Sequence, residues 1–248
     1  MKTLIINPNT HEGMTQNMKK ATENINMKDN QITYLTNKKG PASVEGYFDG
    51  VVSSEGVLSI IAENKEDYDV FIVACYSDHP SIYAAREITD KPVLGIAESS
   101  MLLACMVSEK FSIVTTSKKW EPLLRKAVES YGLKNRCASV RSTELSVLEY
   151  EEKSTQEVQE ILLEKSRLAV KKDGAESIIL GCAGMTSEYK FLNKNIEVPV
   201  IEGVRAAINF GEVLVNLGIK TSKLGTFASV IPRDTQNLNQ ELTSVYKK

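Results

Sequence analysis

The sequence has little excess of charge and few cysteines or histidines. Its 30 Lys and Arg residues nearly balance 32 Asp and Glu, for a formal net charge of -2, so no basic field is available to hold a nucleic acid or an anionic bilayer. The four cysteines stand far apart without a CxxC pair, unlike a disulfide framework or a structural zinc site. Two histidines make no metal cluster. We therefore expect no metal site and no nucleic acid partner.

Long hydrophobic runs are also missing. The N-terminal residues turn polar after a very short apolar run, too short for the core of a signal peptide. Residues 101–107 form one of the most apolar stretches, far below the ~20 residues that a membrane-spanning helix needs. The composition, 42% hydrophobic over 248 residues, suffices for one large core or two modest ones. These features predict a soluble, cytoplasmic protein without a membrane partner.

Short β-rich runs alternate with helical stretches along the chain. Strands are predicted at residues 3–7, 31–35, 70–74, 93–97, 111–115, 138–141, 177–181 and 200–202. This alternation indicates βαβ units and a mostly parallel sheet. A capping box at Ser154 and Glu157 predicts a helix that runs towards Lys172, and Gly174 is its stop signal.

An internal repeat divides the chain into two similar halves. Cys75 and Cys182 each follow a β-rich run, and each precedes a Pro-Val pair that opens the next strand, at the same interval of 107 residues. Residues 6–10 align with residues 113–117 at that interval. We expect an α/β fold with two pseudo-symmetric, Rossmann-like (flavodoxin-like) lobes, residues 1–98 with 205–248 and residues 99–204. Because ligands bind at the carboxyl ends of strands in such sheets, both cysteines should face a cleft between the lobes.

The two repeated cysteines are the candidate catalytic residues. A cysteine between a strand and a helix lies near backbone N–H donors and the positive end of the helix, which favour the thiolate. A small buried residue that fills the strand end is the commoner role for a single cysteine, but the symmetric placement favours catalysis. Cys105, inside an apolar helix at residues 99–107, and Cys137, near a strand start, are expected to be structural.

Two thiols on opposite faces of a carbon acid can invert its stereocentre. One thiolate removes the proton while the other thiol supplies one, and the roles reverse in the return direction. Unperturbed thiols titrate near pH ~8.5, close enough to neutral for this exchange without a cofactor. The negative charge on the intermediate calls for clustered donors. Such groups stand at Asn9, Thr10, Ser77, residues 115–117 and residues 181–184, although the same residue types are common in turns and caps.

At these positions the sequence resembles the hydantoin racemase and allantoin racemase branch of the aspartate/glutamate racemase superfamily. The resemblance rests on residues 6–10 (INPNT), 40–46 (GPASVEG), 74–75 (AC), 95–98 (GIAE), 111–116 (FSIVTT), 180–185 (LGCAGM) and 221–223 (TSK), in family order along nearly the whole chain. It implies two pseudo-symmetric lobes, a homo-oligomer and a small-molecule substrate held in the cleft. It also implies that Cys75 and Cys182 are the acid/base pair and that residues 40–46 cover the cleft. The expected substrate-binding residues are Asn9, Ser77, Thr115, Thr116, Ala183 and Gly184.

One segment departs from the family pattern. After the first cysteine the related enzymes read an aromatic residue and then Gly-Asp-Pro-Gly, whereas residues 76–80 here read Tyr-Ser-Asp-His-Pro. Ser77 adds a hydroxyl, and His79 could reach the cleft as an acid/base or anion-binding group. A histidine beside a helix start is more often a surface or capping residue. His11 has the same two interpretations.

Three functions compete at this stage. The first is racemisation of a 5-substituted hydantoin or an allantoin-like ureide. The second keeps the scaffold but changes the reaction, as in amino-acid racemases, maleate cis-trans isomerases and arylmalonate decarboxylases. The third is a non-catalytic binding or thiol-redox protein, although thiols that hold a carbon between them stand too far apart for a disulfide, which needs Cα atoms within ~7 Å.

Overall fold

The computed structural model describes residues 1–23, 25 and 30–247, which form two parallel four-stranded sheets. The first sheet contains β1 (Lys2–Asn7), β2 (Gln31–Thr36), β3 (Val70–Val73) and β4 (Val93–Gly95), in the order β2-β1-β3-β4. The second contains β5 (Phe111–Thr115), β6 (Cys137–Ser142), β7 (Ser177–Gly181) and β8 (Val200–Glu202), in the order β6-β5-β7-β8. The eight predicted strands are therefore confirmed, as are two repeated α/β lobes.

Helices cover both sheets, as the uninterrupted apolar strands require. The first lobe carries α1 (Glu12–Thr22), α2 (Tyr47–Asn64) and α3 (Pro80–Ile88); the second carries α5 (Trp120–Ser130), α6 (Val147–Glu152), α7 (Thr155–Asp173) and α8 (Tyr189–Asn195), with short 3-10 helices η1 (Lys134–Arg136) and η2 (Ala183–Glu188). The capping box of Ser154 with Glu157 opens α7, and Gly174 ends it in the left-handed conformation, as predicted. Among the helices in the described part of the chain, none is long and apolar enough to cross a membrane.

The repeat is offset by one residue in one strand pair. Ile6 pairs with Val73 in the first sheet, and Val114 pairs with Leu180 in the second. Since Leu180 follows Val73 by 107 residues, the equivalent of Ile6 is Val114 rather than Ile113. The predicted alignment of β1 with β5 is thus wrong by one position, because the connection from β5 to β7 is one residue shorter than that from β1 to β3.

Two equivalent helices join the lobes. α4 (Ile96–Val107) follows β4 directly, so the predicted strand at residues 93–97 ends two residues early, and α9 (Gly203–Asn216) follows β8 in the same way. The two helices pack against each other, and each also contacts the other lobe's sheet. An ideal Cβ on Gly203 would lie only 2.9 Å from the Ile96 carbonyl oxygen, so the close approach requires glycine. The lobe boundaries at residues 98 and 204, within this junction, stay a prediction.

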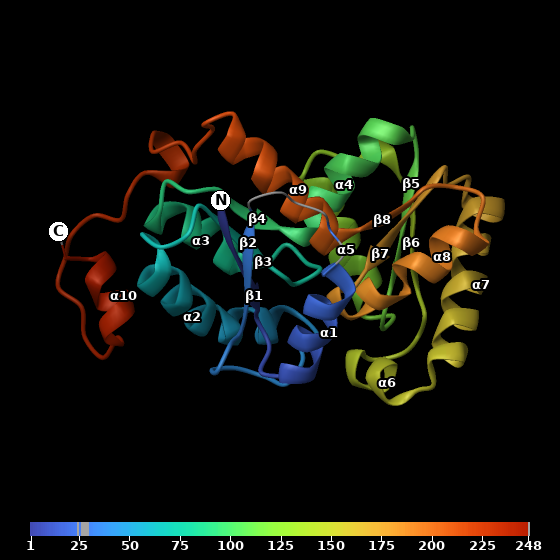
Figure 1. Cartoon of the computed structure of the whole chain (residues 1–248), viewed down its shortest axis with the longest axis horizontal. Coiled ribbons are helices and arrows are strands. Elements are labelled where there is room, and N and C mark those ends of the chain that lie inside the picture. Colours follow the sequence, from blue (N-terminus) through green and yellow to red (C-terminus); the bar gives the residue numbers. More distant parts are fainter. Residues whose placement is uncertain (24, 26–29, 248) are drawn as a thin grey trace.

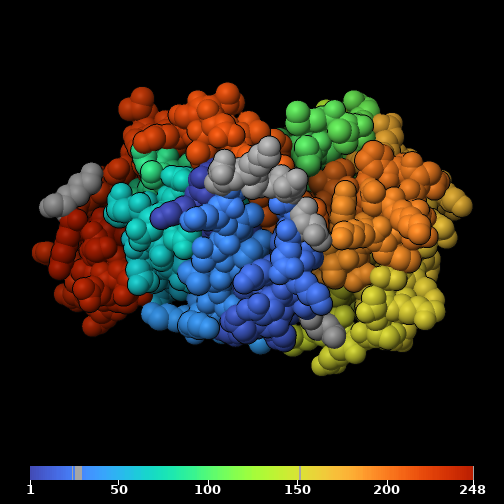
Figure 2. Space-filling model, in the orientation of Figure 1, coloured from blue at the N-terminus to red at the C-terminus, as the bar shows by residue number. Residues whose placement is uncertain are grey.

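The lobes lie side by side, with the blue-to-cyan first lobe beside the yellow-to-orange second (Figure 2). After α9 the chain returns to the first lobe through η3 (Gly225–Phe227) and α10 (Gln240–Val245), which packs against α2 on the outer side (Figure 1). The carboxyl ends of the strands in both sheets therefore carry the loops that meet between the lobes.

Candidate active site

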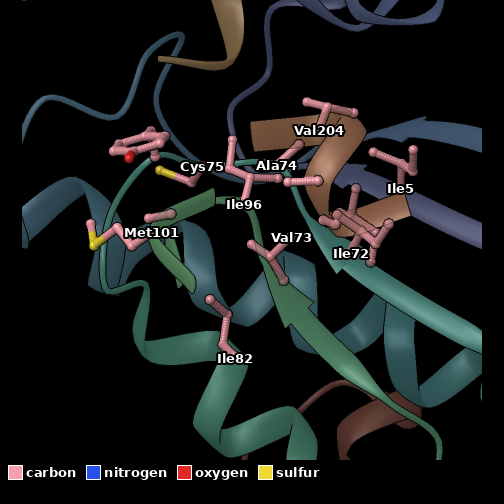
Figure 3. Close-up of a cluster of buried hydrophobic side chains, with 14 of the residues drawn as sticks. Ile5, Ile72, Val73, Ala74, Cys75, Ile82, Ile96, Met101 and Val204 are labelled. Atoms are coloured by element: carbon pink, nitrogen blue, oxygen red, sulfur yellow. The ribbon is translucent and has the colours of Figure 1, made fainter. Parts of the chain in front are cut away.

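Both repeated cysteines line one small cavity between the lobes. Cys75 lies two residues beyond β3, and Cys182 directly follows β7. Figure 3 shows Val73, Ala74 and Cys75 in succession at the end of β3, beside Ile96 and Met101 of α4. The cavity has a volume of about 40 Å³, enough for a few water molecules. Its lining residues are Asn7, Pro8, Asn9, Met14, Met18, Val44, Ala74, Cys75, Tyr76, Thr116, Trp120, Val147, Gly181, Cys182, Ala183 and Gly184.

Several of the predicted binding residues meet at this cavity. Asn9, Thr116, Ala183 and Gly184 line it together with the two cysteines. Asn9 is fixed by its neighbours, because its side-chain oxygen accepts hydrogen bonds from the Asn7 side chain and the His11 backbone N–H, both at 2.9 Å. Ala183 and Gly184 begin η2, for which Cys182 is the N-cap residue. Their roles towards a ligand stay predictions.

The other two predicted residues are placed differently. The Thr115 hydroxyl donates to the Gly181 carbonyl at 2.8 Å, which ties β5 to β7 immediately before Cys182. Ser77 lines an adjoining chamber, and its hydroxyl donates to the Cys75 sulfur at 3.3 Å. Thr115 therefore supports the strand end, whereas Ser77 touches one of the two candidate catalytic atoms.

The electrostatic environment of Cys75 differs from the sequence-based expectation. Burial raises the pKa of the Cys75 thiol to about 11; the Ser77 hydrogen bond acts against this rise, and the charge of Glu45 adds to it. The expected support from a helix N-terminus is weak here, because α3 begins only at Pro80, five residues after Cys75. Desolvation consequently outweighs the helix at this buried position.

His79 is a buried capping residue rather than a cleft or surface group. It is fully shielded from solvent. Its Nδ1 lies 2.7 Å from the Ser81 hydroxyl and 3.4 Å from the Ser81 backbone N–H at the start of α3, and its Nε2 forms a hydrogen bond of 3.1 Å with the Ser53 hydroxyl of α2. Burial lowers the pKa of His79 to about 4, which keeps the ring neutral. The capping interpretation is correct, and the surface position is wrong.

A loop from the first lobe closes over the cavity. Val44 lines it, and the neighbouring Glu45 carboxylate accepts a hydrogen bond at 3.1 Å from the backbone N–H of Val147, the first residue of α6 in the second lobe. Pro41 is held to Thr10 by a backbone hydrogen bond of 2.9 Å. Of residues 40–46, Val44 thus lies at the cavity and Glu45 links the two lobes beside it, while a cover formed by the whole segment stays a prediction.

Trp120 is a site residue that the sequence did not reveal. It begins α5, is 5% exposed, and lines both the thiol cavity and the adjoining chamber. That chamber has a volume of about 220 Å³ and a mostly apolar lining: Gly46, Tyr47, Gly50, Val51, Ser77, Asp78, Pro80, Trp120, Leu123, Leu124, Lys126 and Ala127. The cavity therefore adjoins an apolar space on the Cys75 side.

Asp78, at the border of this chamber, is anchored from both lobes. Its carboxylate accepts hydrogen bonds from the hydroxyls of Tyr83 in the first lobe and of Ser130 and Tyr131 in the second. The loop that follows Cys75 is thereby fixed to α5. Within the described residues, no group of three or more His, Cys, Asp or Glu side chains is placed to hold a metal ion.

Comparison with known proteins agrees with this geometry. Residues 4–211 match the family model for Asp/Glu/Hydantoin racemase. The hydantoin racemase of Pseudomonas sp. (strain NS671) is 43% identical over 228 residues, covering 92% of this chain and 91% of that protein. The hydantoin racemase of Rhizobium meliloti is 36% identical, covering 90% and 92%.

Solved structures give the same assignment. The allantoin racemase from Klebsiella pneumoniae superimposes with a TM-score of 0.91 at 35% identity over the whole of both chains. The maleate isomerase Iso from Pseudomonas putida S16, at 16% identity, shares the fold with a TM-score of 0.62, over 88% of this chain and 93% of that one. The chain belongs to the Asp/Glu/hydantoin racemase family, which places its activity among the racemases.

Proposed function

We propose that this chain racemises 5-substituted hydantoins by proton transfer between Cys75 and Cys182, without a cofactor. One observation carries the proposal: the two thiols follow equivalent strands of the two lobes and line a single cavity. In one direction the thiolate of one cysteine takes the proton from C5 and becomes a thiol. The other cysteine then gives its proton to the opposite face of C5 and becomes the thiolate.

The apolar chamber supports a hydantoin with an apolar substituent. It adjoins the thiol cavity at Trp120, and the Asp78 carboxylate at its border is already occupied by three hydroxyl donors. An alkyl or aryl group on C5 has no polar atoms to desolvate, so its transfer from water into this apolar chamber would cost little free energy. The cavity itself, at about 40 Å³, is far smaller than the ~300 Å³ of typical ligand sites. A hydantoin ring therefore needs more room at the two thiols than this structure offers.

Allantoin is the second candidate substrate. A polar pocket of about 340 Å³ meets the thiol cavity at Gly184, and its lining includes Asn17, Gln159 and Glu188. A ureido group needs hydrogen-bond partners of this kind. The similarity to the Klebsiella pneumoniae allantoin racemase favours the same substrate.

The first experiment follows exchange and inversion at C5 in D2O by proton NMR and polarimetry. Single enantiomers of 5-methylhydantoin, 5-benzylhydantoin and allantoin are compared. Cys75→Ser and Cys182→Ser should each abolish inversion, because loss of a positioned acid/base group typically costs 10²–10⁴-fold. Each variant should still exchange hydrogen for deuterium in only one enantiomer, and the two variants should select opposite enantiomers. Inversion retained in either variant would refute the two-thiol mechanism; Cys105→Ser, at a cysteine outside the cavity, is the matched control.

A second experiment tests whether the chamber takes the substituent on C5. An ideal Cβ on Gly50 meets only Pro80, at an ordinary 3.7 Å, so Gly50→Leu should fill the chamber without displacing the backbone. We expect kcat/KM for 5-benzylhydantoin to fall by about 10–200-fold, the usual range for a lost apolar subsite, while that for 5-methylhydantoin is kept. Gly50→Ala is the control. An equal loss for both hydantoins would show that the chamber does not take the substituent.

A further inference from the structure

Ser77 and Gly184 occupy equivalent positions beside the two thiols. Each lies two residues after its cysteine, and the cysteines follow the equivalent strands β3 and β7. The Ser77 hydroxyl donates a hydrogen bond of 3.3 Å to the sulfur of Cys75. Gly184 has no side chain with which to do the same for Cys182. The two halves of the repeat therefore differ at this position.

The surroundings of Cys75 give this hydroxyl particular weight. Cys75 is only 8% exposed, the negative charge of Glu45 in the covering loop acts on it, and Cys182, which would carry a charge as thiolate, lines the same cavity from the other lobe. Both oppose a thiolate at Cys75, as does burial. Tyr76, next in the chain, directs its hydroxyl to Ser100 instead. Ser77 thus supplies a donor where a buried thiolate needs one.

We propose that Ser77 is a catalytic hydrogen-bond donor that stabilises the thiolate of Cys75 and so makes the two acid/base groups unequal. The inference rests on the proposed two-thiol function. For one enantiomer, the Cys75 thiolate takes the C5 proton and the Cys182 thiol returns one to the opposite face. The other enantiomer begins from the Cys182 thiolate and the Cys75 thiol. The hydroxyl stabilises the enzyme form that begins the first direction.

The kinetic consequence follows from the equilibrium constant of one between enantiomers. The kcat/KM values of the two enantiomers must stay equal in every variant. A difference between the two thiols therefore appears only in the separate kcat and KM values of the two enantiomers. Without the Ser77 hydroxyl, the Cys75 thiolate is a stronger base but is less populated. Both kcat and KM should rise for the enantiomer that Cys75 deprotonates, relative to the other. A hydrogen bond to a charged group is worth enough to change the ratio of the two kcat values about tenfold.

The test is the pH dependence of alkylation by iodoacetamide, which reacts with thiolates, followed at each cysteine by peptide mass spectrometry. In Ser77→Gly and Ser77→Ala the midpoint for Cys75 should rise by about one pH unit, and that for Cys182 should stay. Ser77→Thr keeps a hydroxyl and should restore the original midpoint. Gly184→Ser, the symmetry-matched variant, should lower the midpoint for Cys182. An unchanged Cys75 midpoint, or equal changes at both cysteines in Ser77→Gly, would overturn the proposal.

The alkylation assay uses no substrate, so it separates this inference from the proposed function. A raised Cys75 midpoint without activity on any hydantoin would retain the Ser77 donor and reject the substrate. Activity on hydantoins with an unchanged Cys75 midpoint and an unchanged kcat ratio in the Ser77 variants would support the substrate and reject the Ser77 donor. Circular dichroism of each variant across the whole pH range of the alkylation assay confirms that the chain stays folded where each midpoint is measured.

Discussion

Replacing His79 tests whether a buried, neutral imidazole makes the stability of this protein depend on pH. Burial lowers the pKa of His79 to about 4 from an ordinary value of 6.5. Between these values the unfolded chain binds a proton that the folded chain does not. The contribution of His79 is therefore fully present above pH 6.5 and is lost as the pH falls towards 4.

The size of the effect follows from the same two values. Between pH 7 and pH 5, proton binding to the unfolded state alone should remove about 2 kcal/mol from the free energy of unfolding. His79→Asn abolishes this titration, and asparagine is itself a good N-cap for α3. The variant loses the hydrogen bond to Ser53, worth about 1–3 kcal/mol where a buried partner is left unpaired, at both pH values. Its deficit against the wild type should therefore shrink by about 2 kcal/mol at pH 5.

Urea unfolding measures this difference without changing the ionic strength. Fluorescence of Trp120, the single tryptophan, reports on the junction of the lobes. Ser53→Ala is the control, because it removes the same hydrogen bond but keeps the imidazole, and it should follow the wild-type pH dependence. A deficit of His79→Asn that is identical at pH 7 and pH 5 would refute the assignment of a neutral, buried ring.

Three further predictions concern the lobe junction and the chemistry. Gly203→Ala should destabilise the fold by about 1–3 kcal/mol in urea titrations, since its Cβ would press on the Ile96 backbone. Gly50→Ala, in an open helical position, should stabilise the fold by up to about 1 kcal/mol. Changes of the same sign in the free energy of unfolding of both variants would contradict the packing argument. Asp78→Asn, which weakens hydrogen bonds to both lobes, should raise KM more than Tyr131→Phe, which removes one of them; equal effects in steady-state assays would count against an anchor role. Added EDTA should leave racemisation unchanged, and a loss of activity that zinc restores would contradict the cofactor-free mechanism.

The strands and the repeat were accessible from the sequence because buried parallel strands are continuous apolar runs. The alignment of β1 with β5 failed by one residue, since matching residue types does not report which residues pair across a sheet. Here the register is set by hydrogen bonds to β3 and β7, whose spacing along the chain differs in the two lobes. The start of α4 was missed for a related reason: Ile96 and Ala97 are apolar and buried whether they extend a strand or open a helix.

The candidate site could be predicted only where residue chemistry is distinctive. The cysteines and the turn at residues 181–184 stand out by type and spacing. Trp120 and Val44 do not, because an apolar residue that lines a cavity has the same pattern as one in a core. The setting of His79 depends on Ser53, 26 residues earlier on another helix, which local sequence cannot indicate. The raised pKa of Cys75 likewise arises from burial by both lobes.

The two lobes are alike at the strand ends that carry the cysteines but differ in the pockets beside them. The equivalent strand ends of β3 and β7 supply two thiols, which suits the proposed racemisation, because its two directions are mirror images at one carbon. Recognition of the rest of the substrate cannot be symmetric, since only the hydrogen changes sides. The surroundings accordingly differ: an apolar chamber adjoins the Cys75 side, and a polar pocket adjoins Gly184.

The residues that follow each cysteine also make different contacts in the two lobes. His79 and Thr186 are equivalent, each four residues after its cysteine. His79 ties its turn to Ser53 of α2, whereas Thr186 donates at 3.0 Å to the buried carboxyl of Glu202, the N-cap residue of α9. The matched positions are therefore held by different hydrogen-bond partners in the two lobes. Residues at equivalent positions can in this way differ between the lobes while the duplicated scaffold is kept.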